Sequence, residues 1–389
     1  MPPLRILHAV RQYLPGIGGI ENFVAQLAAE QRRAGHDVRV VTLDHIFDGD
    51  GRRLAVDETI GGVRVHRVAF TGSRRYPFAP GALRHIDDAD VIHVHGIEFF
   101  AEAFALARPW NRAALVLSTH GGIFHTSTMA WAKRLWFATV TRLTLRRYDR
   151  VIASSLPDAA AFARIARGKV VAIENGVDVA KFAGLATPGT RTMLYFGRLA
   201  PNKRVHRLLA WFAGLRAHDP DWRLIVAGKP MGVDPAELRQ AAHELGIAGS
   251  VAFHPSPSDD ALRTLIAWSS VYACASDYEG FGLAAVEAAS SGLFPLLSDI
   301  PAFRRTLDRL GDGMAIGFDA DADHATFLEA FAAFEADAGR HARLTDRLAS
   351  FGWSGVAADI EDVYRTALAG RNRGAPPVGA QQQRLAAMP

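Results

Sequence analysis

The first half of the chain alternates short apolar runs with longer amphipathic stretches. The apolar runs are rich in Val, Ile and Leu without regular polar alternation, as parallel strands buried on both faces require. Residues 20–34 have the pattern of an amphipathic helix that Gly35 closes. This order of strand and helix predicts a doubly wound α/β sheet. The expected strands are residues 5–10, 38–43, 63–68, 91–94, 115–118 and 151–154.

A second series of the same kind follows a stretch rich in Gly, Pro and Thr at residues 183–191. Two Rossmann-like units are therefore predicted, residues 1–183 and 184–352. Residues 353–370 are expected to be helical, and residues 371–389, rich in Pro, Gly and Gln, to be a disordered tail. The second series predicts strands at 193–197, 223–228, 250–254, 271–276 and 293–298, and helices at 205–218, 235–245 and 259–268.

Composition agrees with a soluble or peripheral two-domain protein. A length of 389 residues suits two domains, and 49% hydrophobic and 22% charged residues are globular values. The single cysteine, Cys274, lies in an apolar strand pattern and cannot form an internal disulfide, which fits a reducing cytoplasm. No stretch approaches the roughly 18–20 apolar residues of a membrane span, and the first apolar run is too short for a signal peptide.

The net charge of +4 is unevenly distributed. Residues 1–180 hold 23 Lys and Arg against 17 Asp and Glu, whereas residues 181–389 hold 21 against 23. This excess predicts an anionic partner for the first half. A nucleic acid is not expected, because no stacking motif accompanies the small net charge.

The nine residues EGFGLAAVE place two carboxylates, Glu279 and Glu287, around a glycine-rich turn and an apolar helix start. Eight positions are a little over two helical turns, so Glu287 points back toward the end from which the helix grows. The backbone N–H groups of the Gly-Phe-Gly turn meet the positive end of the helix dipole, which favours a phosphate. A capped surface helix with two unrelated glutamates is the alternative.

Two further strand ends carry candidate binding residues. In GRLAPNKR, residues 197–204, Arg198 and Lys203 lie five apart across a turn and can both reach a diphosphate, although a solvated basic helix start gives the same pattern. In PGIGGIE, residues 15–21, Gly18 and Gly19 permit a tight turn against a ligand, or an ordinary strand-to-helix turn.

STHGGIFHT, residues 118–126, places His120 at a strand's carboxyl end, where open α/β sheets bind ligands. Metal binding is not expected there, since His93, His95, His120 and His125 lack a spacing typical of zinc. Asp-x-Asp strings also lie in turns without a common context and are interpreted as solvated loops. These are Asp48/Asp50, Asp88/Asp90, Asp219/Asp221 and Asp319/Asp321/Asp323.

Residues 131–148, WAKRLWFATVTRLTLRRY, mix aromatic and basic residues in a helical pattern. Such a helix suits an anionic membrane surface, and a core helix with a charged outer face is the alternative. The basic excess of the first half favours the membrane, and Arg74 and Arg75 could join this face. The candidate membrane or acceptor residues are Trp131, Lys133, Arg134, Trp136, Arg142, Arg146 and Arg147.

With VYACAS before it and SGLFPLLSDIP after it, EGFGLAAVE resembles the E-x7-E signature of glycosyltransferase family 4, retaining enzymes of the two-domain GT-B fold. GRLAPNKR resembles the family's G-R-x-x-x-x-K-G, with Arg204 in place of glycine, and PGIGGIE resembles its GG-x-E loop. The resemblance implies two Rossmann-like domains across a ligand cleft, with the last helix crossing back to the first domain.

Strings over most of residues 4–370 resemble, more narrowly, the cellobiosyl-diphosphoprenyl α-mannosyltransferases of xanthan and acetan biosynthesis. Among them are VRQYLPGIGGIE, GSRRYPFAP, HVHGIEFF, IENGVDVAKFAG and TMLYFGR. The resemblance implies transfer of mannose from GDP-mannose to the terminal glucose of cellobiosyl-diphosphoprenol through an α-1,3 bond, without a metal cofactor. It also implies a cytoplasmic enzyme, peripheral on the inner face of the bacterial plasma membrane, in exopolysaccharide repeat-unit assembly.

The same resemblance implies the roles of the candidate residues. Glu279 would hold mannose hydroxyls, Glu287 would accept bonds from the ribose, and Arg198 and Lys203 would neutralise the departing diphosphate. His120 would lie near the mannose C6 hydroxyl, and retention without an obvious protein nucleophile implies front-side attack. The implied donor-binding residues are Gly18, Gly19, Arg198, Lys203, Glu279, Gly280, Phe281, Gly282, Leu283 and Glu287.

Three alternatives stay open on the residues alone. The same fold could use a UDP-sugar or another acceptor. It could belong to a GT-B sugar epimerase or phosphorylase, or to a non-catalytic module that binds nucleotide sugars.

Overall fold

The computed structural model describes residues 2–16, 18–47, 51–74, 76–120 and 135–373. They form two compact units: unit 1 comprises the described residues of 1–176 and 353–373, and unit 2 comprises residues 177–352. The division therefore falls after Gly176, earlier than the predicted boundary at 183. Residues 177–183 belong to unit 2 because Val177 and Phe182 are buried in its core clusters.

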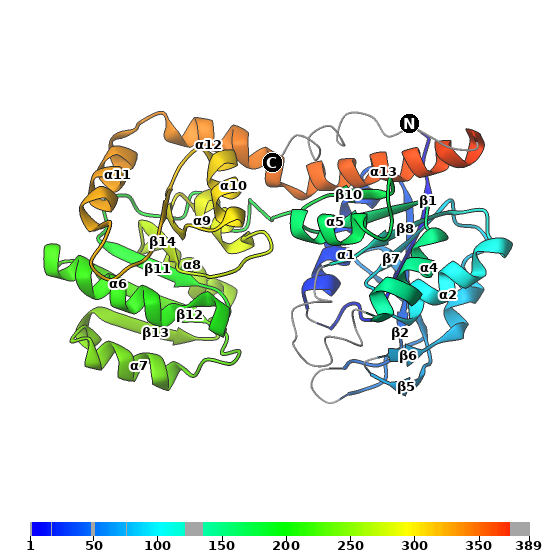
Figure 1. Cartoon of the computed structure of the whole chain (residues 1–389), viewed down its shortest axis with the longest axis horizontal. Helices are drawn as coiled ribbons and strands as arrows, with labels where there is room; N and C mark the ends of the chain where they lie inside the picture. The colour runs from blue at the N-terminus through cyan, green and yellow to red at the C-terminus, as the bar shows by residue number, and fades with distance from the viewer. Residues whose placement is uncertain (1, 17, 48–50, 75, 121–134, 374–389) are drawn as a thin grey trace. The chain divides into compact units, whose positions relative to one another are not determined.

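Unit 1 contains an eight-stranded sheet in the order β10-β9-β8-β7-β1-β2-β4-β3, with all pairs parallel except β3 with β4 (Figure 1). The six predicted strands are confirmed to within one residue at each end. The prediction missed the edge strands β3 and β10 and the hairpin β5–β6, which are short and lie at least partly at the surface. The strands are β1 Arg5–Val10, β2 Asp37–Leu43, β3 Asp57–Ile60, β4 Val63–Val68, β5 Thr71–Ser73, β6 Tyr76–Phe78, β7 Val91–His95, β8 Ala114–Ser118, β9 Arg150–Ala153 and β10 Val170–Ala172.

Helices cover both faces of this sheet. Successive strand residues point to opposite faces, so Ile6 and Val10 of β1 join one apolar cluster with α1 and α13, while Leu7 joins another with α2 and α5. His8 is two residues from both Ile6 and Val10, so its side chain points to the same face and lies toward α1 and α13. The helical elements are α1 Gly19–Arg33, η1 Pro80–His85, α2 Phe99–Ala107, η2 Arg108–Trp110, the π-helical turn η3 Phe137–Thr141, α4 Arg142–Arg146, α5 Leu156–Ala163 and α13 Trp353–Arg373.

The C-terminal helix α13 returns to unit 1, as predicted, and contacts α1 and β8 (Figure 1). Ile360 and Tyr364 are fully buried there, which makes α13 part of the core of unit 1. The helix continues through Arg373, so the prediction of a disordered tail from residue 371 is wrong for its first three residues. Arg371 is held because its guanidinium donates to the carbonyl of Ala113.

Unit 2 contains a six-stranded parallel sheet in the order β13-β12-β11-β14-β15-β16. The chain builds outward from β11 to β13, then crosses back to place β14 beside β11, so a topological switch point lies between β11 and β14. Unit 1 has the corresponding switch point between β1 and β7. The strands are β11 Thr192–Phe196, β12 Arg223–Gly228, β13 Val251–Pro255, β14 Val271–Cys274, β15 Phe294–Ser298 and β16 Met314–Ile316.

Three helices of unit 2 were predicted, and each begins at the predicted residue. Those at 205–218, 235–245 and 259–268 are confirmed to within one residue. The helical elements of this unit are η4 Pro201–Lys203, α6 Val205–His218, α7 Pro235–Glu244, η5 Ala248–Ser250, α8 Asp259–Ala267, α9 Leu283–Ser291, α10 Pro301–Leu310, α11 His324–Ala336, α12 Arg340–Leu348 and η6 Ala349–Phe351.

Replacing Gly228 by Ala should destabilise unit 2. A Cβ at Gly228 would lie 1.9 Å from the carbonyl oxygen of Gly197, so the ends of β11 and β12 would have to separate. We expect a loss of about 1–3 kcal/mol in the free energy of unfolding, measured by urea denaturation. Gly249→Ala is the control, because a Cβ there meets no atom within 4 Å. Equal stability of the two variants would contradict this reading.

Candidate active site

The loops after β11 and β14 meet at the switch point of unit 2. Lys203, in the loop after β11, forms an ion pair with Glu279, in the loop after β14, and both side chains are nearly buried, at 13% and 12% exposure. Ser276 also donates to Glu279, over 2.8 Å. Both bonds fall on Oε1, and no described residue bonds Oε2 of this carboxylate. The second carboxylate oxygen is therefore available to a ligand.

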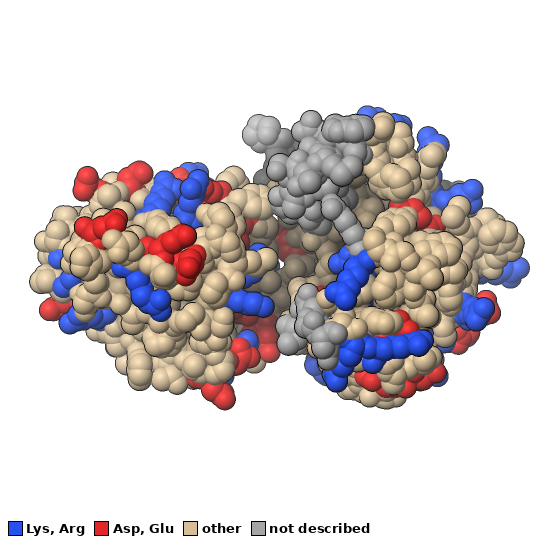
Figure 2. Space-filling view, turned by 90° about the horizontal axis from the view of Figure 1, so that it is seen from below, with Lys and Arg blue, Asp and Glu red and all other residues tan. Residues whose placement is uncertain are grey.

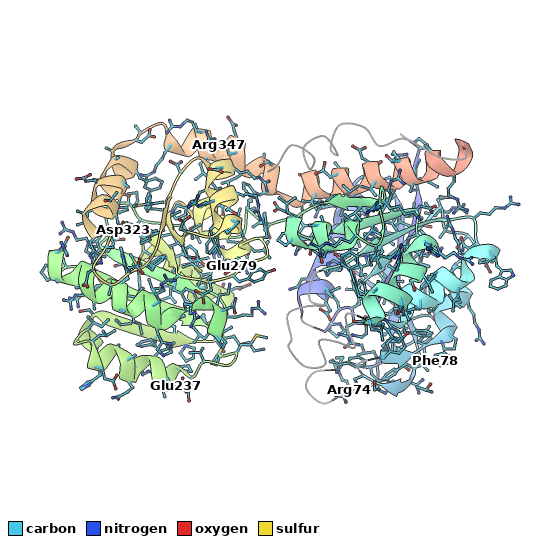
Figure 3. All side chains as sticks on the ribbon, viewed as in Figure 1. Arg74, Phe78, Glu237, Glu279, Asp323 and Arg347 are labelled. Carbon is cyan, nitrogen blue, oxygen red and sulfur yellow. The ribbon has the colours of Figure 1, made fainter. Side chains whose placement is uncertain are left out.

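Neighbouring residues strengthen the contact between the two loops. The Asn202 carbonyl accepts from the Asp277 backbone N–H at 2.9 Å, and the Asn202 side chain donates to the Tyr278 carbonyl at 3.1 Å. Arg204 forms an ion pair with Asp277. Three successive residues of one loop thus bind three successive residues of the other, which holds Glu279, labelled in Figure 3, in place.

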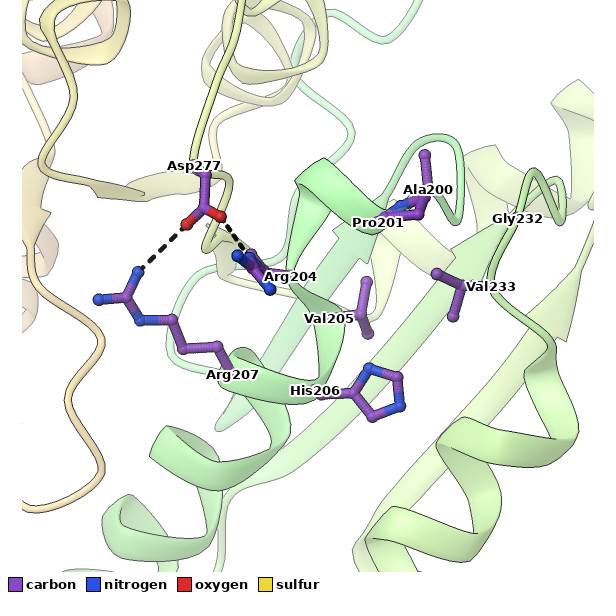
Figure 4. Close-up of a pocket in the computed structure, with 9 residues that line it drawn as sticks. All are labelled: Ala200, Pro201, Arg204, Val205, His206, Arg207, Gly232, Val233 and Asp277. Carbon is purple, nitrogen blue, oxygen red and sulfur yellow. Dashed lines mark hydrogen bonds and ion pairs between the residues drawn. The ribbon is translucent and has the colours of Figure 1, made fainter. Parts of the chain in front are cut away.

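Arg204 adopts the left-handed conformation, with φ of 49°, where the family pattern has glycine. That conformation costs a non-glycine residue about 1 kcal/mol or more, and the ion pair with Asp277 offsets part of it. Arg207 approaches the same carboxylate at 3.6 Å. These residues border a cavity of about 510 Å³ (Figure 4). Its lining residues are Ala200, Pro201, Arg204, Val205, His206, Arg207, Gly232, Val233 and Asp277.

Arg198 is exposed and does not join this group. Its guanidinium lies 3.7 Å from the sulfur of Met231, and its carbonyl accepts from the Tyr195 hydroxyl at 2.7 Å. The two predicted diphosphate ligands therefore have different partners: Lys203 pairs with Glu279, while Arg198, just after β11, contacts Met231.

The Gly-Phe-Gly turn precedes the nine-residue helix α9 as predicted. Gly282 has φ of 89°, and a Cβ there would lie 2.7 Å from the ring of Phe303, so both conformation and space favour glycine. No side chain caps α9, so its first backbone N–H groups, beginning with that of Leu283, can bind an anion. Gly280 lies in the turn just before this helix. The Phe281 side chain is buried with Val286, so only its backbone can serve a ligand.

Glu287 is partly buried on α9. Burial raises the pKa of its carboxyl, and the opposing charge of Lys181 lowers it. Because no described side chain donates to this carboxylate, it can accept hydrogen bonds from a ligand's hydroxyls. That agrees with the predicted ribose contact without testing it.

In unit 1, the loops after β1 and β7 lie at the corresponding switch point. Gly18 caps α1 with extended backbone, and a Cβ there would lie 2.1 Å from the carboxylate of Glu21, so the glycine makes room for that side chain. Gly19 faces open space. The first turn of α1 is therefore accessible to a ligand, as predicted for this loop.

His120 follows β8 with φ of 54° and is partly exposed. Its Nε2 lies 2.9 Å from Nδ1 of His95, and its ring packs edge-on against Phe23 at 4.7 Å between centroids. Burial lowers the pKa of His120 to about 4, so the ring is neutral near pH 7. His93, His95 and His8 lie together behind it, whereas His125 falls outside the described residues.

Two functional candidates in unit 1 were missed. Glu98 follows β7, and its Oε1 lies 3.0 Å from Arg11, which follows β1. Burial raises the pKa of Glu98 to about 7, against the lowering effect of Arg11. Glu98 Oε2 and Arg11 Nε are buried without a partner among the described residues. A signal was available in the sequence, because Arg11 and Glu98 lie one and three residues after strands that meet at a switch point.

The Asp-x-Asp strings are surface loops where the structure describes them. Asp88 and Asp90 pair with Arg39 and Arg5, and Asp219 and Asp221 both pair with Arg191. Asp48 and Asp50 lie outside the described residues. The string at 319–323 lies between β16 and α11.

The aromatic and basic segment is described from residue 135, so Trp131, Lys133 and Arg134, like Arg75, lie outside the described residues. Its buried side, including Leu145, belongs to the core of unit 1. Its outer side exposes Leu135, Trp136 and Leu143 at 58%, 47% and 59%. Arg142, Arg146 and Arg147 are exposed alongside them. The inner face is therefore that of a core helix, and the outer face carries the residues on which the membrane prediction rests; that prediction stays a prediction.

We call Leu135, Trp136, Leu143, Tyr76 and Phe78 the apolar patch. Tyr76 and Phe78 of the hairpin are 42% and 53% exposed, and the Tyr76 ring lies 6.4 Å from that of Trp136. Elsewhere on unit 1, the face in Figure 2 shows Lys and Arg in several separate groups with acidic side chains between them. The positive charge of this unit is therefore not one continuous surface on that face.

Two family models match successive parts of the chain: Glycosyltransferase Family 4 over residues 17–181 and Glycosyl transferases group 1 over residues 178–348. Among solved structures, sucrose-phosphate synthase from Thermosynechococcus elongatus superposes with a TM-score of 0.69 and 19% identity over 94% of this chain and all of that one. A glycosyltransferase from Rickettsia africae gives 0.70 and 16% over 94% and 99%. These structures show the fold, which is GT-B as predicted.

Curated relatives match along nearly the whole chain. The GDP-mannose:cellobiosyl-diphosphopolyprenol alpha-mannosyltransferase of Xanthomonas oryzae is 42% identical, covering 94% of this chain and 97% of the relative. The protein of the same name from Komagataeibacter xylinus is 40% identical over 94% of each. A phosphatidyl-myo-inositol mannosyltransferase of Mycolicibacterium smegmatis is 31% identical over 90% of each. The chain therefore belongs to glycosyltransferase family 4, in the group of the cellobiosyl-diphosphopolyprenol alpha-mannosyltransferases.

Proposed function

We propose that this glycosyltransferase moves mannose from GDP-mannose to the terminal glucose of cellobiosyl-diphosphoprenol, forming an α-1,3 bond with retention in exopolysaccharide repeat-unit assembly. The observation that carries the proposal is the 40–42% identity to relatives of that name over 94% of the chain. The arrangement of Lys203, Glu279 and the amino end of α9 supports it, because these groups suit a sugar, a phosphate and their connecting bond.

Unit 2 holds the donor. The N–H groups of the turn at 280–282 and the start of α9 bind the diphosphate, and Arg198 and Lys203 supply positive charge. Oε2 of Glu279 accepts from mannose hydroxyls, and Glu287 accepts from the ribose. Each charge-assisted hydrogen bond contributes about 1.5–3 kcal/mol.

The reaction exchanges one bond for another at the mannose anomeric carbon. The bond to the diphosphate oxygen breaks, the acceptor oxygen bonds the same face, and the acceptor proton passes to the leaving phosphate. Negative charge on the diphosphate grows as the bond breaks, so fixed cations and N–H groups bind the transition state more strongly than the substrate. We propose that these groups act without a metal ion.

The acceptor is lipid-linked, and we propose that unit 1 brings the enzyme to the inner face of the plasma membrane. None of the described helices is long and apolar enough to cross a membrane. The apolar patch and the neighbouring Arg142, Arg146 and Arg147 support binding to an anionic surface, because apolar side chains enter the headgroup region while arginines pair with phosphates.

The donor and acceptor can be tested directly. Purified protein, GDP-mannose and cellobiosyl-diphosphoprenol should give a product heavier by one hexose in mass analysis, with EDTA present. Methylation analysis should locate the new bond at O3 of the terminal glucose. Product from a UDP-sugar but not from GDP-mannose would contradict the donor, and loss of product with EDTA would contradict metal independence.

Glu279→Gln should abolish most transfer while GDP still binds. The amide cannot pair with Lys203 or bind hydroxyls as an anion does, so we expect kcat to fall about a hundredfold or more, and Kd for GDP to stay the same or to decrease. Glu237→Gln is the control, since this glutamate is exposed on α7 (Figure 3) and should leave kcat unchanged. Full turnover in the Glu279 variant would refute its role.

Replacing both Trp136 and Leu143 by Ser should weaken binding to vesicles of anionic phospholipid by about tenfold or more, because two apolar side chains leave the interface. Sedimentation with the vesicles measures the effect. Trp268→Ser, at a tryptophan that is 60% exposed on unit 2, should bind like the wild type. Unchanged sedimentation of the double variant would show that the apolar patch does not bind the membrane.

A further inference from the structure

A chain of buried hydrogen bonds leads from His120 into the core of unit 1. His120 Nε2 lies 2.9 Å from His95 Nδ1, and His95 Nε2 lies 2.9 Å from His8 Nδ1. His8 Nε2 lies 2.7 Å from the amide oxygen of Gln31, on α1. His8, His95 and Gln31 are fully or almost fully buried, so water does not compete for these bonds.

Sheet register brings the histidines together. His8 of β1 is paired with His93 of β7, and two residues further along β7 His95 is paired with Ser118 of β8. Residues two apart on a strand share a face, so His93 and His95 both point toward α1 and α13. The imidazoles of His8, His93 and His95 therefore lie close together, near Ser118 at the end of β8. His120 follows two residues later.

The chain continues beyond Gln31. Its amide nitrogen donates to the Tyr364 hydroxyl at 3.2 Å, and that hydroxyl lies 2.6 Å from His93 Nδ1. His93 Nε2 lies 2.7 Å from the Ser118 hydroxyl. Helix α13 thus contributes Tyr364 to the network. Gln31 connects the bonds that lead through His8 to His120 with those that lead through Tyr364 to His93.

Gln31 sets the direction of the bonds toward His120. An amide oxygen only accepts, so His8 carries its hydrogen on Nε2 and presents a lone pair on Nδ1. His95 must then donate from Nε2, which leaves its Nδ1 to accept from His120 Nε2. In a neutral ring, His120 Nδ1 then carries a lone pair, and no described residue bonds that atom.

The rings are neutral in this arrangement. Burial lowers the pKa of His8 and of His120 to about 4, and lowers the pKa of His95 well below its usual range, with the neighbouring histidines adding to the effect. A proton added to His8 or His95 would replace an acceptor by a donor and break one bond of the chain, whereas a proton added to His120 would remove the lone pair of its Nδ1.

A metal ion does not fit this packing. The ligand atoms of His8, His93 and His95 lie within 4.8 Å of one another, which would suit an ion by distance. However, two imidazole nitrogens on a tetrahedral zinc are roughly 3.3 Å apart, whereas those of His8 and His95 are 2.9 Å apart. Both nitrogens of each ring already have hydrogen-bond partners.

We propose that Gln31, His8 and His95 are positioning residues that hold His120 with its hydrogen on Nε2, so that Nδ1 accepts a hydrogen bond from a hydroxyl of the bound sugar. The inference rests on the proposed function, since that supplies the sugar. The left-handed backbone of His120 and the edge of Phe23 restrict the ring in the same way. The histidine then acts as a fixed acceptor and not as an acid.

The direction of the chain can be measured without substrate. The full-length protein with ¹⁵N-labelled histidine side chains should show, by NMR, a protonated Nε2 and an unprotonated Nδ1 for His120, assigned by the signals missing from His120→Gln. Hydrogen on Nδ1, or on both nitrogens, would overturn the proposal.

His8→Asn and His8→Leu form a matched pair. Both lose the bond to Gln31, but only asparagine offers an oxygen, close to the position of Nδ1, that can accept from His95. We expect His8→Leu to mix the His120 tautomers and to lower kcat about tenfold with little change in KM, and His8→Asn to restore most of both. Equal kcat in the two folded variants, checked by thermal unfolding, would overturn the proposal.

Failure of the proposed function can be told apart from failure of this inference. If wild-type protein transfers no mannose, the proposed function is wrong, and the NMR measurement alone then decides whether the chain holds His120 in this tautomer.

Discussion

The ion pair between Lys203 and Glu279 is the interaction on which the donor site depends. It joins the loops that follow two neighbouring parallel strands, β11 and β14, at the carboxyl ends of these strands and at the switch point of the sheet. The flanking bonds of Asn202 and Arg204 to residues 277 and 278 make the contact three residues wide. A nearly buried pair of this kind requires both partners, because either charge alone would be left without compensation.

The ion pair also uses only one of the two carboxylate oxygens of Glu279. Glu279 has one oxygen bound by the protein and one available, while the adjoining turn and α9 provide N–H groups. Lys203 is paired with Glu279, and in the proposed function it would share its charge with the diphosphate. Arg198 is exposed, so in the proposed function its side chain could move to the phosphates at little cost.

In unit 1, a chain of hydrogen bonds connects the core to the ring of His120. Its core contains histidines that an ordinary apolar core would exclude, and each is tolerated because its nitrogens are bonded. The C-terminal helix α13, which is buried in the core of unit 1 although it follows unit 2 in sequence, adds Tyr364 to this network.

Sequence patterns alone determined the inner strands of both sheets, the helices that follow several of them, and the loops that carry Lys203, His120 and Glu279, because buried parallel strands and glycine turns have local signatures. Edge strands such as β3 escaped detection, since they are short and half exposed. Only the tertiary structure decided that Glu279 pairs with Lys203, that Arg198 contacts Met231 instead, and that His8 bonds both Gln31 and His95. Strand order and register create those contacts, and neither is written in the local spacing of the residues.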